Sequence, residues 1–302
     1  MNIDIVIPIS VNDYNVAKTT IPYVLSFLEP KRIVVVGNSK ISEFIEQDFA
    51  DNSKVSFVDE DKMIEGLSFK YLRNVMATRN AEKRTGWYYQ QLLKLGYALT
   101  TEDDYYITWD ADMIPLKKIS FFDSENHPLF SSSNEYNGYY FNTLKNLLNL
   151  DKCMKDSFIS EHMVFNTETV RTMLGEIESD SGKKWYDRII ESVADNHLAG
   201  SGFSEFETYG TYCVTRYPDK YRFRKLHALR GGKTIFGVIP DVEVLKWLSK
   251  CYDTISFEKF DSCRIYSKPY TSAFFRKVVS PYVYVKVCIN YVKLFRKTDK
   301  TK

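Results

Sequence analysis

Residues 3–9 have the sequence Ile-Asp-Ile-Val-Ile-Pro-Ile, a short and mostly apolar run. Residues 32–36 (Arg-Ile-Val-Val-Val) and 55–58 (Val-Ser-Phe-Val) repeat this pattern. Runs of this length and composition are typical of strands buried in a parallel sheet. Helices are expected between them, at 14–28 (with a break or kink at Pro22) and at 41–49. Strands and helices that alternate with short connections predict an α/β fold with a mainly parallel central sheet.

Polar residues follow each of these strands. Residues 10–13 follow the first strand, Asn38 the second, and Asp59-Glu60-Asp61 the third. Ligands of parallel α/β sheets bind outside the carboxyl ends of the strands, so these residues are predicted to lie on the binding edge. The alternative for residues 59–61 is an acidic loop in solvent.

A fourth strand, expected at 105–109, runs directly into Asp110-Ala-Asp112. Two carboxylates at positions i and i+2 after a buried strand can point into one cleft. Mg²⁺ and Mn²⁺ bind through one or two carboxylates together with phosphate oxygens, and such an ion stabilises a departing diphosphate. The alternative to a metal site is that the two aspartates merely form a turn after the strand. The aromatic strand that precedes them makes this alternative less favoured.

Composition excludes several classes of protein. The 302 residues include 41 Lys and Arg against 39 Asp and Glu, a net charge of +2, which excludes a strongly basic nucleic-acid binder. The five cysteines are widely spaced with no C-x-x-C pair, which argues against a disulfide framework and a structural zinc site. No signal peptide and no apolar run of transmembrane length is found, so a cytoplasmic location is expected.

Four stretches in order resemble bacterial GT-A-like glycosyltransferases of cell-surface polysaccharide loci, in particular a family often described only as a domain of unknown function. They are residues 84–95 (Arg-Thr-Gly-Trp-Tyr-Tyr-Gln-Gln-Leu-Leu-Lys-Leu), 104–112, 160–165 (Ser-Glu-His-Met-Val-Phe) and 203–210 (Phe-Ser-Glu-Phe-Glu-Thr-Tyr-Gly). The resemblance covers roughly residues 1–240. It implies a GT-A-like, Rossmann-like nucleotide-binding domain over residues 1–245, with a C-terminal extension over 246–302.

The resemblance also implies roles for residues of the binding edge. A nucleotide-sugar donor (a UDP-, GDP- or CMP-sugar) is expected at Pro8 and Ser10, with Asp59 pairing with the base. Arg84 suits the diphosphate because a guanidinium matches phosphate oxygens in a bidentate way; as a lone arginine it is otherwise a surface ion-pair partner. Trp87 and Gln91 are candidates for contacts to sugar or acceptor, and core packing is the alternative for Trp87.

The metal ion (Mn²⁺ or Mg²⁺) is expected on Asp110 and Asp112, with Asp110 also contacting the donor. GT-A enzymes commonly use a late histidine as a third ligand, which fits His227. His162 is expected near the substrate, and for either histidine a structural or substrate-binding role is favoured over metal binding.

An inverting transfer needs a carboxylate that takes the proton of the acceptor hydroxyl. Glu205 is chosen for this role, with Glu207 as the fallback; a retaining reaction would need no such base. The alternative is that Ser204, Glu205 and Glu207 simply start a helix, as an N-cap followed by acidic residues in the first turn.

Residues 276–302 are basic and interleaved with apolar side chains, and Asp299 is their only acid. Such a segment favours peripheral contact with anionic lipids on the inner face of the cytoplasmic membrane, which suits a lipid-linked glycan acceptor. A helix docked on the main domain with a disordered basic end is the alternative.

The favoured function is therefore a metal-dependent glycosyltransferase, hexosyltransferase in type, that acts on a saccharide in capsule, lipopolysaccharide or exopolysaccharide synthesis. A nucleotidyltransferase that makes the sugar nucleotide is a weaker hypothesis, because residues 8–15 contain no glycine and no arginine for a phosphate loop. A non-catalytic glycan-binding or scaffold protein is the third.

Overall fold

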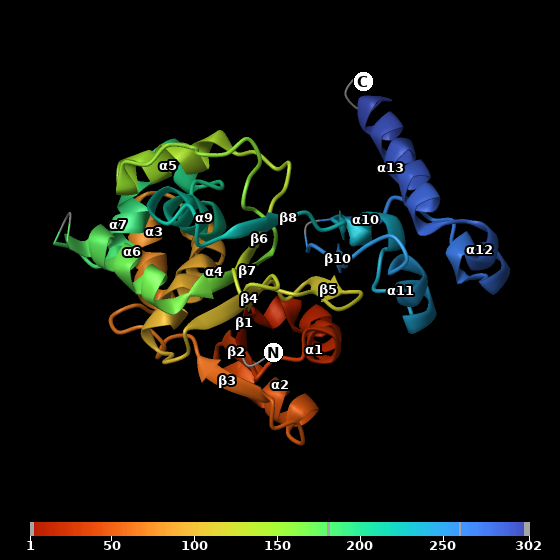
Figure 1. Ribbon diagram of the computed structural model, residues 1–302, viewed down its shortest axis with the longest axis horizontal. Coiled ribbons are helices and arrows are strands. Elements are labelled where there is room, and N and C mark those ends of the chain that lie inside the picture. Colours follow the sequence, from red (N-terminus) through yellow and green to blue (C-terminus); the bar gives the residue numbers. More distant parts are fainter. Residues whose placement is uncertain (1–2, 180–181, 260, 299–302) are drawn as a thin grey trace. The chain divides into compact units, whose positions relative to one another are not determined.

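A computed structural model describes residues 3–179, 182–259 and 261–298 (Figure 1). The chain forms two compact units. Unit 1 comprises residues 1–14, 30–110 and 120–225; unit 2 comprises residues 15–29, 111–119 and 226–302.

Unit 1 is built on a five-stranded sheet in the order β3-β2-β1-β4-β7. Its strands are β1 (Asp4–Pro8), β2 (Ile33–Gly37), β3 (Val55–Asp59), β4 (Tyr105–Trp109) and β7 (His162–Asn166). The first four run parallel and β7 pairs with β4 in the antiparallel direction. The predicted α/β fold with a mainly parallel central sheet is confirmed, and so is the helical C-terminal region.

The strand order places a topological switch point between β1 and β4. The chain leaves β1 toward β2 and β3 on one side and then returns to β4 on the other side. Val6 of β1 pairs with Thr108 of β4, so Pro8 and Asp110 lie at neighbouring carboxyl ends. Open α/β sheets bind ligands at such a point, because the two connections diverge there and leave a crevice.

The α-helices of unit 1 are α2 (Ser39–Phe49), α3 (Phe69–Thr78), α4 (Thr85–Gly96), α5 (Gly138–Leu148), α6 (Thr167–Ser179), α7 (Trp185–Ser192), α8 (Asp195–Leu198) and α9 (Glu205–Arg216). A parallel pair, β6 (Leu129–Ser131) with β8 (Arg222–Arg224), completes the unit.

Helix α4 is buried over most of its length and packs against β1, α3 and α9. Tyr88, Leu92 and Leu95, which share one face of the helix, are fully buried. Leu99 is 47% exposed, because the chain leaves the α-helix after Gly96 and continues as a 3₁₀ turn.

Unit 2 has a core of its own. Its elements are α1 (Tyr14–Leu28, of which Tyr14 belongs to unit 1), β5 (Met113–Pro115), β9 (Ala228–Leu229), α10 (Gly232–Phe236), α11 (Val242–Leu248), β10 (Thr254–Ser256), α12 (Ala273–Val278) and α13 (Pro281–Thr298). The expected break at Pro22 does not occur, since α1 continues through it. Strand β10 pairs with both β5 and β9.

This pairing changes the predicted division into residues 1–245 and 246–302. Ile114 and Leu116 share one apolar cluster with Trp247, Ile255 and Tyr284. Residues 15–29 and 111–119 are thereby joined to the C-terminal part, which begins at residue 226 and not at 246. The C-terminal region therefore shares a core with two earlier segments of the chain.

Candidate functional site

The ammonium group of Lys94 lies between two carboxylates of unit 1. Its Nζ donates to Oδ1 of Asp110 at 2.6 Å and to Oε1 of Glu205 at 2.7 Å. The side chains of Lys94 and Glu205 are 7% and 5% exposed, whereas that of Asp110 is 32% exposed. The cluster therefore has a buried pair inside and one carboxylate that reaches the surface.

Charge pairing keeps Lys94 ionised. Burial alone lowers the pKa of this lysine, but the charges of Asp110 and Glu205 and their hydrogen bonds raise it above its ordinary value. The ammonium also lies 4.4 Å from the centroid of the Phe206 ring, whose face attracts a cation. With one positive and two negative groups, the cluster carries a net negative charge.

Glu205 is the first residue of α9. Its backbone N–H donates to Oε1 of Gln91 at 3.2 Å, and the amide nitrogen of Gln91 donates to the carbonyl of Trp87 at 3.3 Å. Burial raises the pKa of Glu205, an effect that the Lys94 charge opposes. The helix start is also capped as the alternative interpretation requires, since Ser204 Oγ accepts from the N–H of Glu207.

Asp110 follows β4 directly, and its N–H donates to the carbonyl of Glu161 at 2.9 Å. Glu161 is 5% exposed and adopts a left-handed backbone with φ of 61°, which is rare for a residue with a side chain. Strain of this kind persists only where the surrounding structure enforces it, and it gathers at functional sites. The start of β7 thus fixes the position of Asp110.

Asp112 and His227 both lie in unit 2, and the strand register separates them. The N–H of Phe257 donates to the carbonyl of Asp112, whereas the N–H of Asp253 donates to the carbonyl of His227. These positions are four residues apart on the β10 segment, roughly 13 Å at the rise of an extended strand. The exposed His227 contacts the Cys251 carbonyl and the Asp253 carboxylate, so the structure does not bring it to Asp112.

Within residues 3–179, 182–259 and 261–298, no group of three or more His, Cys, Asp or Glu side chains is arranged to hold a metal ion. Mg²⁺ needs only one or two protein carboxylates when phosphate oxygens supply further ligands. The partly exposed carboxylate of Asp110 fits that requirement; a site made of protein ligands alone does not fit.

The donor-binding candidates of the sheet lie at the carboxyl ends of β1 and β3. Pro8 is buried in β1, and the hydroxyl of Ser10 donates to Asp13 in the following 3₁₀ turn. Asp59, at the end of β3, forms an ion pair with Lys62 at 3.1 Å and accepts from the N–H of Asp61. Pro8 and Ser10 adjoin the switch point next to β4, whereas Asp59 lies on the edge strand.

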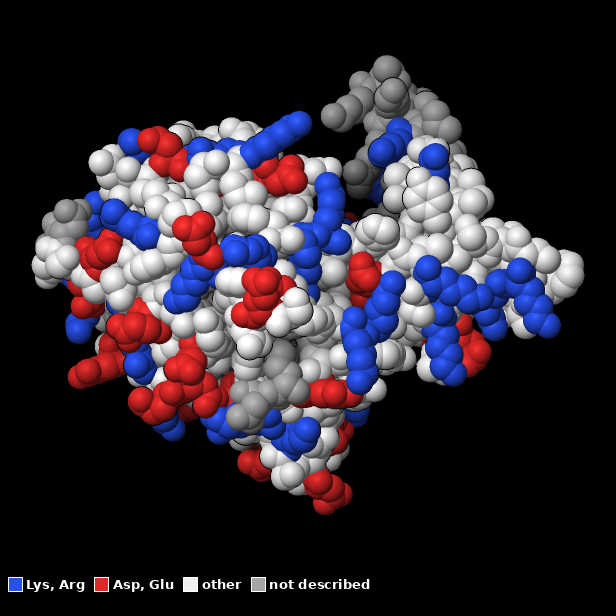
Figure 2. Space-filling view, in the orientation of Figure 1, with Lys and Arg blue, Asp and Glu red and all other residues white. Residues whose placement is uncertain are grey.

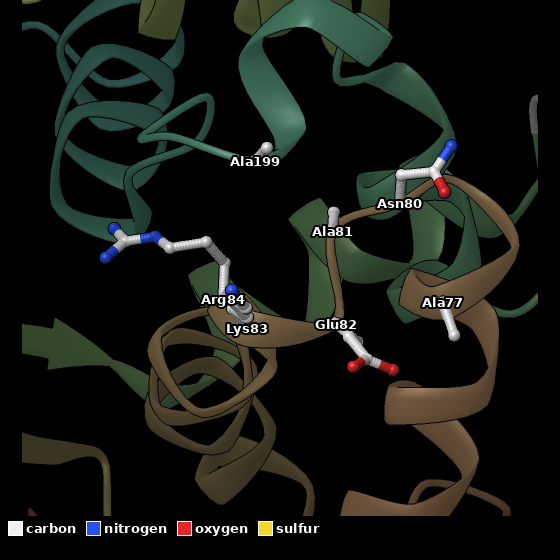
Figure 3. Close-up of a pocket in the computed structure, with 7 residues that line it drawn as sticks. All are labelled: Ala77, Asn80, Ala81, Glu82, Lys83, Arg84 and Ala199. Carbon is white, nitrogen blue, oxygen red and sulfur yellow. The ribbon is translucent and has the colours of Figure 1, made fainter.

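Arg84 and Trp87 lie at the other end of α4 from Lys94. The guanidinium of Arg84 lies 4.5 Å from the centroid of the Trp87 ring and donates to the Gly200 carbonyl and the Ser201 hydroxyl. Arg84 also lines a cavity of about 400 Å³, whose other walls are Ala77, Asn80, Ala81, Glu82, Lys83 and Ala199 (Figure 3). At 1.5 Å per residue, Arg84 is roughly 15 Å along the helix from Lys94, so this cavity is a separate feature.

His162 and Glu207 are buried structural residues. His162 packs between Trp109 and Phe121, and its Nε2 lies 3.0 Å from the Ser131 hydroxyl. Burial, with a contribution from the Arg224 charge, lowers its pKa to about 3, so the ring is neutral. Glu207 is 1% exposed, and its Oε2 accepts from the N–H of Phe158. Both side chains are therefore buried and paired with protein groups.

Lys94 was not among the candidate residues predicted from the sequence, although its surroundings held a signal. Trp87, Gln91 and Lys94 fall on one face of the helix, and this mixture of an aromatic, an amide and a charge is unusual for a solvated surface. The structure shows that Gln91 and Lys94 are buried.

Three solved structures illustrate what the chain is similar to. The apo form of mouse xyloside xylosyltransferase 1 is 12% identical over 86% of this chain and 98% of that chain, with a TM-score of 0.48. The galactosyltransferase LgtC in complex with donor and acceptor sugar analogs is 11% identical over 92% of this chain and 100% of that chain, with a TM-score of 0.43. The apo form of the glycosyltransferase GlyE from Streptococcus pneumoniae TIGR4 is 10% identical over 97% of this chain and 63% of that chain, with a TM-score of 0.44.

No curated protein matches the chain. A family model described as a family of unknown function, DUF6492, matches residues 1–278. The match extends past residue 245, where the resemblance was expected to end, and includes all of α12. The chain belongs to the DUF6492 family.

Proposed function

We propose that the chain is a glycosyltransferase that moves a sugar from a nucleotide-sugar donor to a saccharide acceptor. One observation carries the proposal: the four stretches of the sequence resemblance converge on Lys94. Helix α4 supplies Lys94 and Gln91, and the start of α9 supplies Glu205. Asp110 directly follows β4, and its N–H is held by the carbonyl of Glu161, which directly precedes β7. This cluster adjoins the switch point of the sheet, where α/β proteins bind nucleotides.

In this proposal the nucleotide binds at Pro8 and Ser10, next to Asp110, with Asp59 as a further candidate at the neighbouring edge. Asp110 would hold Mn²⁺ or Mg²⁺ together with phosphate oxygens of the donor diphosphate. Such an ion supplies Lewis-acid stabilisation to a departing diphosphate. We assign no role in metal binding to His227, because of its distance from Asp112 along β10.

Lys94 acts as a positioning residue. Its ammonium holds one carboxylate oxygen of Asp110 and thereby fixes the orientation of that side chain, which is about one-third exposed. Glu205 fixes Lys94 in turn, because a buried ammonium is costly unless it is paired. With 5% exposure, Glu205 fits this supporting role better than that of a base that must reach an acceptor hydroxyl.

Hydrolysis of UDP-, GDP- and CMP-sugars without acceptor, with Mn²⁺ or Mg²⁺, tests the proposal. We expect release of the nucleoside diphosphate, or of the monophosphate from a CMP-sugar, and a loss of at least about 100-fold in rate for Asp110→Asn. Asp104→Asn is the matched control, since Asp104 immediately precedes the amino end of the same strand. An inactive wild-type protein with every sugar nucleotide would exclude the proposal.

The same assay separates the other two hypotheses. A nucleotidyltransferase would consume a nucleoside triphosphate and a sugar phosphate and release pyrophosphate. A scaffold protein would release nothing in vitro, and its cellular role would survive Asp110→Asn. A transferase for capsule, lipopolysaccharide or exopolysaccharide would instead lose surface glycan with that substitution.

Peripheral contact with an anionic membrane through α13 is part of the proposal. Tyr284, Val285 and Cys288 face the core of unit 2, so the outward face of the helix presents Val283 and Val287, which are 52% and 61% exposed. The sequence has no acidic residue from 262 to 298, and Figure 2 shows basic but no acidic side chains over α12 and α13 on the face in view. The side chains of residues 294–298, and residues 299–302 altogether, lie outside the description.

Apolar side chains mixed with basic ones fit the interface of an anionic bilayer, where each basic residue contributes about 1 kcal/mol. Among the helices in the described part of the chain, none has the length and apolar character to cross a bilayer. We expect sedimentation with phosphatidylglycerol-containing vesicles but not with pure phosphatidylcholine ones, and loss of this binding in Val287→Asp. Val238→Asp is the control, since Val238 is 68% exposed elsewhere in unit 2. Equal binding of both variants would refute the contact.

A further inference from the structure

Two partly exposed aromatic rings, Trp87 and Tyr139, lie near the N-terminal end of α4, and each forms a pair with a neighbouring side chain; these are called the two ring pairs. Trp87 carries the guanidinium of Arg84 over its ring at 4.5 Å. Tyr139 stacks on His197 with 3.6 Å between ring centroids and 20° between planes, yet it remains 48% exposed. A partner on one side fixes the orientation of each ring. A role in core packing does not explain Tyr139, because half of its surface is in solvent.

Both pairs are tied to the same two residues, Gly200 and Ser201. Arg84 donates to the Gly200 carbonyl at 2.8 Å, and the N–H of Gly200 donates to the carbonyl of His197 at 3.1 Å. Asn137, which caps the helix that carries Tyr139, donates to the Ser201 carbonyl at 3.0 Å. The segment 200–201 therefore holds the two ring pairs in one surface.

This surface is connected to the ion cluster in two ways. Trp87, Gln91 and Lys94 lie on one face of α4, and Trp87 is about 10 Å from Lys94 along the helix axis. The segment that holds the rings also leads from Ser201 directly to Glu205, four residues later. The cavity that Arg84 lines is also lined by the polar residues Asn80, Glu82 and Lys83 (Figure 3).

We infer that this surface, made of Arg84, Trp87, Tyr139 and His197, binds a saccharide ring of the acceptor. Sugar rings present C–H faces that pack on aromatic rings, and hydroxyl groups that bond to guanidinium, amide and carboxylate groups. Aromatic side chains held in place by neighbours, with polar groups beside them, match that amphipathic chemistry. The inference rests on the proposed glycosyltransferase function, and it adds Tyr139 and His197 to the residues in contact with substrate.

Saturation-transfer NMR with lactose, maltose and chitobiose tests the subsite without a donor. We expect saturation transfer to at least one of these disaccharides, with aromatic protons of the protein irradiated. Trp87→Ala and Tyr139→Ala should each weaken binding by about 3- to 10-fold, which corresponds to the loss of one ring contact. Trp87→Phe keeps a ring and should retain most of the affinity.

Tyr217→Ala is the matched control. Tyr217 is 36% exposed and lies beneath the ammonium of Lys220 at 5.6 Å, so it resembles the Arg84–Trp87 pair. It follows the last residue of α9, roughly 18 Å along that helix from Glu205. Its loss should leave disaccharide binding unchanged.

Two results would overturn the inference: no saturation transfer to any of the three disaccharides, or wild-type affinity in both Trp87→Ala and Tyr139→Ala. Hydrolysis of a sugar nucleotide does not need the acceptor, so the donor assay tests the proposed function separately from the subsite. A protein that hydrolyses donor but binds no disaccharide would refute the subsite alone. A protein that binds disaccharide but hydrolyses no donor would refute the proposed function alone.

Discussion

Replacement of Lys94 with methionine removes the one cation between two carboxylates while it keeps the length of the side chain. At the 2.7 Å separation of Lys94 and Glu205, the gross Coulomb attraction is about 6 kcal/mol at an effective dielectric constant of 20. Desolvation of both ions offsets much of this attraction in the folded protein. Removal of one partner of a buried pair nevertheless costs about 3–5 kcal/mol, because the other charge stays buried without compensation.

The Asp110 contact adds less to this figure. Its carboxylate is 32% exposed, so water screens the interaction and the contribution is at most about 1 kcal/mol. Urea denaturation of Lys94→Met, followed by circular dichroism, should therefore show a loss of about 3–5 kcal/mol in the free energy of unfolding. Lys70→Met, at an exposed position of α3, should stay within about 0.5 kcal/mol of wild type.

A second substitution isolates the buried charge as the cause. In Lys94→Met/Glu205→Gln the residue left in the interior is a neutral amide, so we expect at least about 2 kcal/mol of the lost stability to return. Refutation would take either of two forms. Lys94→Met within 1 kcal/mol of wild type would show that the pair is not buried as described. A double variant no more stable than Lys94→Met would show that the loss comes from packing.

Three further predictions concern other buried positions of unit 1. The pKa of His162 is about 3 in the folded protein against an ordinary 6.5, so only the unfolded chain takes up its proton as the pH falls below 6.5. Stability should then fall by about 2 kcal/mol more between pH 6.5 and 5 in wild type than in His162→Gln, and parallel urea curves would contradict this. Gly210→Ala should lose about 1–3 kcal/mol, because a Cβ there would lie 2.3 Å from the Phe158 ring, and an unchanged denaturation midpoint would show that the ring moves aside. Glu207→Gln should cost about 1–3 kcal/mol of stability with donor hydrolysis preserved; a loss of hydrolysis in the folded variant would restore a catalytic role.

The strands were predictable from sequence because they are decided by local composition. The run Tyr105–Trp109 was expected as a strand with the same bounds that the structure has, and the other parallel strands differ from their expected bounds by one or two residues. Their apolar runs are flanked by turn residues, so no distant contact is needed to recognise them.

The organisation of unit 2 depends on contacts that local patterns do not show. Strand β5 has three residues and pairs with β10, about 140 positions further along the chain. Neither segment is long enough to show a periodicity of its own. A helix docked on the main domain was the alternative for the basic segment 276–302, but the core on which α13 packs belongs partly to residues 111–119.

The burial of Lys94 has the same cause. A lysine on a helix is expected to face solvent, since an unpaired ammonium in the interior is costly. What reverses this expectation is the arrival of Asp110, 16 residues away, and Glu205, 111 residues away. Only the folded sheet brings these three side chains together.

Residues that are remote in the sequence also fix the orientation of the acidic side chain at the end of β4. In the proposed function Asp110 must stay near the surface to meet a diphosphate, and a surface carboxylate on a turn is free to rotate. One oxygen held by a buried ammonium, and a backbone N–H held by the carbonyl of the strained Glu161, remove that freedom before any ligand arrives. The fixed lysine in turn requires a second, deeper carboxylate, because pairing with an exposed aspartate alone does not compensate for its desolvation. Glu205 therefore belongs to the site even if it never touches substrate, and its substitution by glutamine should alter Asp110-dependent hydrolysis through Lys94.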